Sequence, residues 1–93
     1  MLRMMLTEER LREVLGKTEG VTDIFIRREG YKFVAAVVSP WYETMEEWQR
    51  QEHAWGLLLK NLTDDEHAMV SFVYTYTPAE QAQPHRDATA DGR

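Results

Sequence analysis

The sequence predicts an α+β domain in which a three-stranded mixed sheet carries helices on one face. The elements are expected in the order helix, strand, strand, helix, strand and a short last helix. Glu29-Gly30 separates two β-rich runs, which is typical of an antiparallel hairpin. Residues 40–66 join the second and third strands through a helix, and such a crossover makes that pair parallel. We assign one domain to residues 1–81 and expect residues 82–93, a polar segment, to be a disordered tail.

The first helix should begin at Thr7, whose side chain can cap it, and end at Gly16 or Gly20. Its short apolar stripe is formed by Leu11, Val14 and Leu15. Two strands should follow, at residues 21–28 and 31–39, because both runs are rich in β-branched and aromatic residues.

Pro40 stops the second strand, and Thr44 with Glu47 three residues later is a capping-box pattern for the next helix. That helix should run to about residue 60 or 61. Six apolar residues are expected on its core-facing side: Met45, Trp48, Trp55, Leu58, Leu59 and Leu62. A second capping pattern, Thr-Pro-Ala-Glu with Pro78 at the first helical position, predicts a short helix after the third strand.

The third strand is expected at residues 67–77, and its alternation divides it into two faces. The more continuously apolar set is assigned to the core: Ala68, Val70, Phe72, Tyr74 and Tyr76. Met69 and Val73 then point outward, as does Phe25 on the first strand. Helices on one side of a sheet leave the other side open, so we expect an apolar patch there that binds a protein partner or a second copy.

The composition of the chain excludes or disfavours several classes of function. The chain has no cysteine, which excludes disulfides and thiolate ligands from this chain and weakly favours a reducing compartment. The N-terminal segment turns charged within eight residues, so we expect a cytoplasmic protein without a membrane span. Residues 40–66 hold seven acidic and two basic side chains, which disfavours binding of phosphate groups. No phosphate loop or catalytic triad pattern is present, so we do not expect an enzyme.

Several segments together resemble the BolA family, whose fold is related to the type II KH domain. "FVAAVVSPWYETM" is similar to the family's strand that ends in Val-Val-Ser before an aromatic residue and a glutamate. "QRQEHAWGLL" is similar to the helix with the family's Arg-His-Arg signature, of which Arg50 remains. "HAMVSFVYTYTPAE" matches most closely, with a His-Ala pair that opens the last strand and Thr-Pro-x-Glu that closes it. The resemblance covers roughly residues 5–81.

The resemblance implies a small, non-enzymatic protein that works through a partner. Family members pair with monothiol glutaredoxins around a bridging iron–sulfur cluster, and some act in stress responses. By that match His67 would be a metal ligand, only in a cluster shared with the partner. The family's second ligand, a His or Cys in the first hairpin loop, has no counterpart in Arg27-Arg28-Glu29-Gly30. We therefore expect a divergent member that holds no metal or cluster as an isolated chain.

Alternative interpretations remain open for each candidate residue. His67 could be only a polar residue that opens a strand. Trp41 and Tyr42 follow the end of a strand and could be exposed anchors for a partner, or could pack over the helix start. Arg27, Arg28 and Lys32 could bind nucleic acid in a KH-like manner, or could be a charged edge that prevents strand pairing. A self-associating structural protein is a further alternative.

Overall fold

The computed structural model describes residues 5–82. Along the chain the elements are α1 (Glu8–Leu15), β1 (Asp23–Glu29), β2 (Lys32–Val38), the 3-10 helix η1 (Pro40–Thr44), α2 (Glu47–Asn61), α3 (Asp64–His67), β3 (Val70–Tyr76) and α4 (Pro78–Ala82). The predicted order is confirmed, with η1 and α3 as additional short helices. The expected tail lies outside the described residues, apart from Ala82 at the end of α4.

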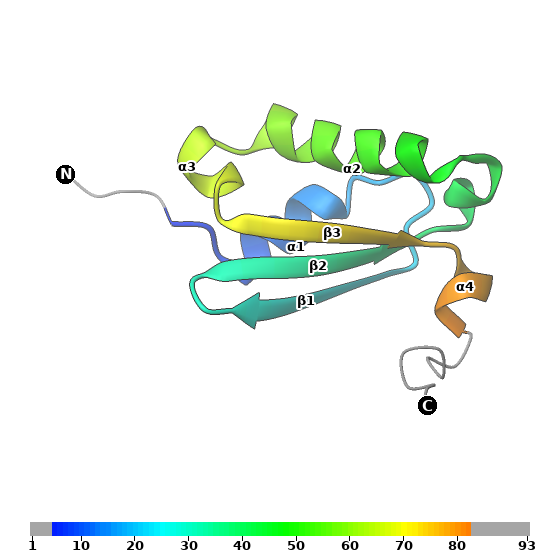
Figure 1. The fold of residues 1–93 in the computed structure, drawn as a ribbon, viewed down its shortest axis with the longest axis horizontal. Helices are drawn as coiled ribbons and strands as arrows, with labels where there is room; N and C mark the ends of the chain where they lie inside the picture. The colour runs from blue at the N-terminus through cyan, green and yellow to red at the C-terminus, as the bar shows by residue number, and fades with distance from the viewer. Residues whose placement is uncertain (1–4, 83–93) are drawn as a thin grey trace.

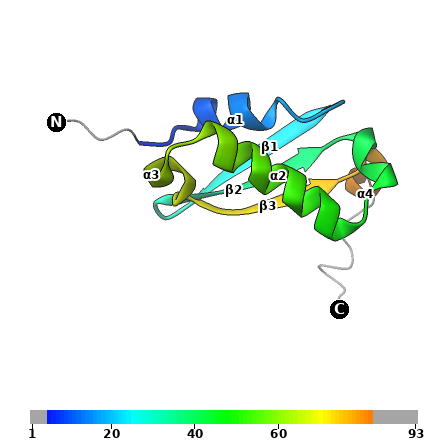
Figure 2. The same cartoon turned by 90° about the horizontal axis from the view of Figure 1, so that it is seen from above.

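The strands form one sheet in the order β1-β2-β3, antiparallel between β1 and β2 and parallel between β2 and β3. Helices α1 and α2 cover one face of this sheet (Figures 1 and 2). The β1–β2 turn and α3 lie at one end of the molecule, while η1 and α4 lie at the other (Figure 1). The predicted α+β class with a mixed three-stranded sheet is therefore confirmed.

Local signals in the sequence account for the first three elements. The side chain of Thr7 accepts a hydrogen bond from the backbone N–H of Arg10 at 3.1 Å, and Gly16 follows the last helical residue. Gly30 has φ +66°, a left-handed conformation that the tight β1–β2 turn requires. The buried core beneath α1 and α2 includes Leu11, Leu15, Phe33, Ala35, Val37, Leu58 and Val73.

The predicted start of α2 is wrong. Thr44 is the last residue of η1, and its hydroxyl donates to the carbonyl of Trp41 at 3.3 Å. The helix instead begins after Glu46, whose backbone N–H donates to the Gln49 side chain at 2.8 Å. The two alternatives differ by a few residues because "ETMEEWQ" contains overlapping capping patterns.

The predicted core-facing side of α2 is also partly wrong. Trp48 is 65% exposed and Leu59 is 69% exposed, whereas Arg50, Ala54 and Leu58 are buried. The small Ala54 side chain allows the helix to approach the sheet closely, which large indole rings at the contact would prevent. The helix is therefore rotated, and two large apolar side chains are left in solvent.

The third strand begins later than predicted, and its faces are reversed over most of its length. His67 is the last residue of α3, and β3 starts at Val70. Phe33 pairs with Val70 but Val34 pairs with Phe72, so Ser71 is an extra residue in a bulge. Because one extra residue exchanges the two faces of a strand, residues predicted inward after Val70 point outward.

Two ion pairs connect segments that are distant in the sequence. The guanidinium of Arg10 in α1 donates to both carboxylate oxygens of Glu66 in α3, at 2.7 and 3.1 Å. Arg50 in α2 donates to Glu80 in α4 at 2.8 Å and also lies 5.8 Å from the centre of the Tyr42 ring. In both pairs the arginine holds the pKa of the carboxyl group below its ordinary value through these hydrogen bonds.

Candidate functional site

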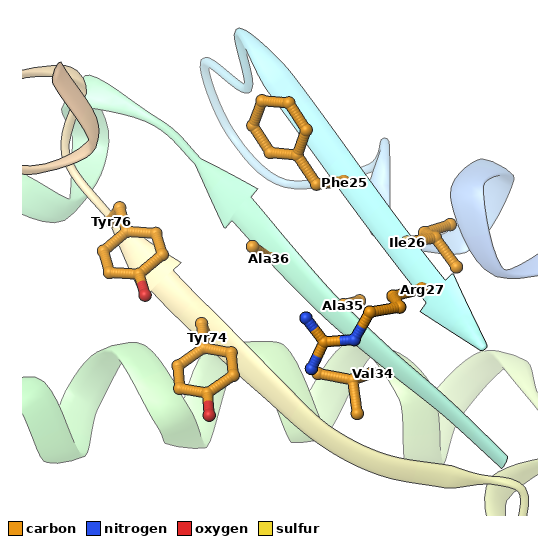
Figure 3. Close-up of a pocket in the computed structure, with 8 residues that line it drawn as sticks. All are labelled: Phe25, Ile26, Arg27, Val34, Ala35, Ala36, Tyr74 and Tyr76. Carbon is orange, nitrogen blue, oxygen red and sulfur yellow. The ribbon is translucent and has the colours of Figure 1, made fainter. Parts of the chain in front are cut away.

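The side of the sheet away from α1 and α2 carries a group of aromatic side chains. We define the open face as seven residues on three strands: Phe25, Arg27, Val34, Ala36, Phe72, Tyr74 and Tyr76. Figure 3 shows all of them except Phe72. Phe25, Ala36 and Tyr74 form one row across the strands, and Arg27, Val34 and Phe72 form the next. Strand pairing alone thus brings together aromatic residues that are about 50 positions apart in the sequence.

The open face is shaped as a groove along β2. Its floor consists of the small side chains of Val34 and Ala36, and Figure 3 shows Phe25 and the two tyrosines on either side. The outer strands of a three-stranded sheet are about 9.5 Å apart, which is the width of this groove between backbones. The hollow has a volume of about 390 Å³. One wall is fixed by ring contacts, since Tyr74 lies 4.8 Å from Phe72 and 6.1 Å from Tyr76, between ring centres.

The groove is largely uncharged. Arg27 extends over Val34 in Figure 3, and its guanidinium is paired with Glu29 at 2.6 Å. Asp23 and Lys32 occupy the same side of their strands, so acidic and basic groups on this side of the sheet are balanced. An apolar surface with little net charge is suited to a protein surface and is poorly suited to nucleic acid.

The prediction for this face was right about Phe25 and wrong about the third strand. Phe25 points outward and is 48% exposed, as expected. Val73, expected outward, is fully buried, and Met69 is half-buried against the core. Phe72 and Tyr74, expected in the core, are 39% and 45% exposed. The sequence contains no residue type that signals the bulge at Ser71. Thr75 and Thr77 also made the set that includes Val73 look more polar, so this set was predicted to be exposed although it is buried.

Tyr42 is not available as an exposed anchor. Its side chain is fully buried beneath α2, where burial raises the pKa of its hydroxyl. Trp41 is half-buried, with its ring 6.2 Å from that of Tyr42 and 4.5 Å from that of His53. The short η1 helix turns both residues toward the core, so packing over the helix start is the arrangement present.

His67 lies at the end of the molecule that also holds the β1–β2 turn (Figure 1). It is half-buried, its ring centre lies 5.5 Å from that of Trp55, and its imidazole makes no hydrogen bond within residues 5–82. Its backbone N–H donates to Thr63 at 2.8 Å, which fixes the residue at the last turn of α3. His67 therefore ends a helix and does not open a strand.

The three basic residues of the hairpin do not form a common site. Arg27 pairs with Glu29 on the open face, while Arg28 lies on the opposite side of β1, 4.8 Å from the centre of the Phe33 ring. Lys32 lies 5.9 Å from the Tyr31 ring. Because consecutive strand residues point to opposite faces, the two arginines cannot act on one phosphate group together.

The His, Asp and Glu side chains of residues 5–82 do not form a complete metal or cluster site. Within residues 5–82, no three His, Asp or Glu side chains are grouped so that they could hold a metal ion. The β1–β2 turn near His67 consists of Gly30 and Tyr31 and contains no imidazole or thiol. No helix in the described part of the chain is long and apolar enough to cross a membrane.

Comparison with solved structures shows that this architecture is BolA-like. A bolA protein homologue from Coxiella burnetii superimposes with a TM-score of 0.68 at 23% identity, over 84% of this chain and 99% of that one. BolA1 from Arabidopsis thaliana gives 0.63 at 23% identity, over 82% and 94%. The BolA domain of SufE1 from Arabidopsis thaliana gives 0.61 at 24% identity, over 81% and 98%. No family model and no curated protein matches the chain. The likeness shows a shared fold.

Proposed function

We propose that this chain is a non-enzymatic, BolA-like binding protein that receives a protein partner on the open face of its sheet. The observation that carries the proposal is the groove between Phe25 and Tyr74, whose aromatic side chains are 48% and 45% exposed on either side of its floor. Rigid aromatic walls around small floor residues accept a row of aliphatic side chains, such as one face of a helix.

A pair of copies centred on the groove does not fill it. When a two-fold axis passes through the centre of the groove, floor lies over floor and wall lies over wall, so the hollow stays open. On the open face, the exposed rings of Phe25, Phe72 and Tyr74 contribute roughly 300 Å² together, whereas a stable interface buries about 800 Å² per partner. These considerations favour a partner with a protruding apolar ridge and a complex that exchanges readily.

The experiment is a comparison of matched variants. Tyr74→Lys places a charge in the groove, and Tyr31→Lys is the control, because Tyr31 is an exposed aromatic residue in the turn and lies outside the open face. A partner is captured from native extract and purified. It should then bind the wild type and the Tyr31→Lys variant with equal affinity. It should bind the Tyr74 variant at least about tenfold more weakly. Equal binding to all three would contradict the proposal.

The partner class that the resemblance implies is a monothiol glutaredoxin, with His67 giving one ligand to a shared iron–sulfur cluster. The position of His67 supports this narrower proposal: its imidazole is half-buried beside Trp55 and makes no hydrogen bond within residues 5–82. Because the chain has no second donor in the hairpin turn, the glutaredoxin would have to supply the remaining ligands. His67→Ala should then weaken the complex and alter its visible absorption spectrum. If both are unchanged, His67 has only a structural role at the end of α3.

Nucleic-acid binding through Arg27, Arg28 and Lys32 is the competing function. It predicts binding to RNA or DNA that weakens steeply as salt rises. The divergent directions of the two arginines and the net charge of −5 disfavour it.

A further inference from the structure

The solvent side of α2 has an unusual composition for an exposed helix face. Trp48 and Leu59 are both well exposed, and Gly56 lies between them. Glycine is the least favourable helix residue apart from proline. A Cβ atom added to Gly56 would meet nothing within 4 Å. The fold of a single copy therefore gives no reason for a glycine at this position.

The surface around Gly56 is hollowed and carries opposite charges on its two sides. The hollow has a volume of about 330 Å³ and is lined by Glu52, His53, Gly56, Leu57 and Lys60. Glu52 lies four residues before Gly56 and Lys60 four residues after it, so the three residues share one face of the helix. Within the part of the chain that the structure describes, neither charged residue forms a salt bridge.

We propose that a second copy of this chain packs on this surface, with the two α2 helices antiparallel and crossing at Gly56. A two-fold axis at Gly56 places Glu52 of one copy opposite Lys60 of the other, and the reverse pair follows from the symmetry. The same symmetry places Leu59 opposite His53 of the second copy. A glycine at the crossing point allows the helix backbones to approach closely.

The charge pattern selects a second copy over an unrelated helix. An acid and a base at equal distances from the crossing point are complementary to the same helix running in the opposite direction. The antiparallel arrangement also opposes the two helix dipoles. Because α2 covers the face of the sheet opposite to the groove, such a dimer leaves both open faces accessible (Figures 1 and 2). The dimer would therefore bind a two-site partner with higher avidity than a monomer.

The absence of cysteine permits a direct test. Gly56→Cys introduces the only thiol of the chain at the proposed axis. Helix axes that are about 8–10 Å apart bring facing Cα atoms to roughly 3.5–5.5 Å, and the upper part of this range overlaps the roughly 4.4–6.8 Å that a disulfide spans. Under mild oxidation this variant should form a cross-linked dimer at least about tenfold faster than a Tyr31→Cys control at the same concentration. Equal rates for the two variants would overturn the proposal.

Sedimentation equilibrium of cysteine-free protein provides the second readout. The wild type should show a concentration-dependent dimer. Glu52→Lys should weaken it at least about tenfold, and the exchange Glu52→Lys with Lys60→Glu should restore it. Circular dichroism checks that each variant is folded. We expect all of them to be folded, because Glu52 and Lys60 are exposed. A wild type that is monomeric up to millimolar concentration, or a charge exchange that restores nothing, would refute the arrangement.

Discussion

Replacement of Arg10 by alanine should destabilise the fold strongly, although Arg10 lies near the surface. The carboxylate of Glu66 is fully buried and accepts two hydrogen bonds from Arg10 and one from the backbone of Thr63. Without Arg10, a buried charge keeps only the Thr63 bond. Breaking a buried ion pair from one side costs about 3–5 kcal/mol. Because the Arg10 side chain is 37% exposed, water can partly replace it, and we expect about 2–3 kcal/mol.

Urea and thermal denaturation measure this effect. For a domain of this size, the expected loss lowers the melting temperature by roughly 10–20 °C. Arg27→Ala is the control, because both partners of the Arg27–Glu29 pair are at least half exposed, and it should cost no more than about 0.5 kcal/mol. If Arg10→Ala stays within about 0.5 kcal/mol of the wild type, the geometry assigned to this ion pair is wrong.

The pH dependence provides an independent check of the same pair. Arg10 depresses the pKa of Glu66 below its ordinary value of 4.5, mainly through its hydrogen bonds. A carboxyl group with a depressed pKa contributes stability that is present above its unfolded-state pKa and is lost as pH falls through the folded-state pKa. The unfolded state is the same in both proteins, so the difference in unfolding free energy between wild type and Arg10→Ala should be largest near neutral pH. It should shrink as the pH falls toward the depressed folded-state pKa of Glu66 in the wild type. A difference that stays constant down to pH 3 would contradict the assignment.

Three further perturbations follow from particular contacts. Glu80→Gln keeps a side chain that can cap α4 but removes the negative charge opposite the nearly buried Arg50. Amide exchange in Pro78–Ala82 should therefore accelerate, and the unfolding free energy should fall by about 1–2 kcal/mol. Gly20→Ala should cost about 1–2 kcal/mol in urea denaturation, because Gly20 has φ +67° and an added Cβ would lie 3.3 Å from the Ser39 hydroxyl. Tyr42→Phe should leave the melting temperature unchanged or raise it slightly. The reason is that the buried hydroxyls of Tyr42 and Thr18 lie near each other without reaching hydrogen-bond geometry. A large decrease would show that the Tyr42 hydroxyl makes a hydrogen bond in the folded protein.

The features that the sequence predicted correctly depend on short-range chemistry. The cap at Thr7, the turn at Gly30 and the Thr77–Glu80 capping box each involve residues no more than three positions apart, and all three are present. The order of elements follows from such local signals, and the length of the crossover between β2 and β3 predicts their parallel pairing. For this reason the α+β class could be anticipated from one sequence, while the BolA-like fold was anticipated from the resemblance of several segments to that family.

Tertiary contacts, and not local sequence patterns, determine which side chains form the site. Two alternating sets of side chains on β3 were both apolar enough for the core, and the extra residue at Ser71 decided that Val73 faces inward and Tyr74 outward. On α2, the close approach of Ala54 to the sheet decided which side is buried and left Trp48 exposed. The pairing of Arg10 with Glu66 spans 56 positions, and no local pattern encodes such a contact. Periodicity predicts that an element has an apolar face, but the packing of its neighbours determines which face is covered.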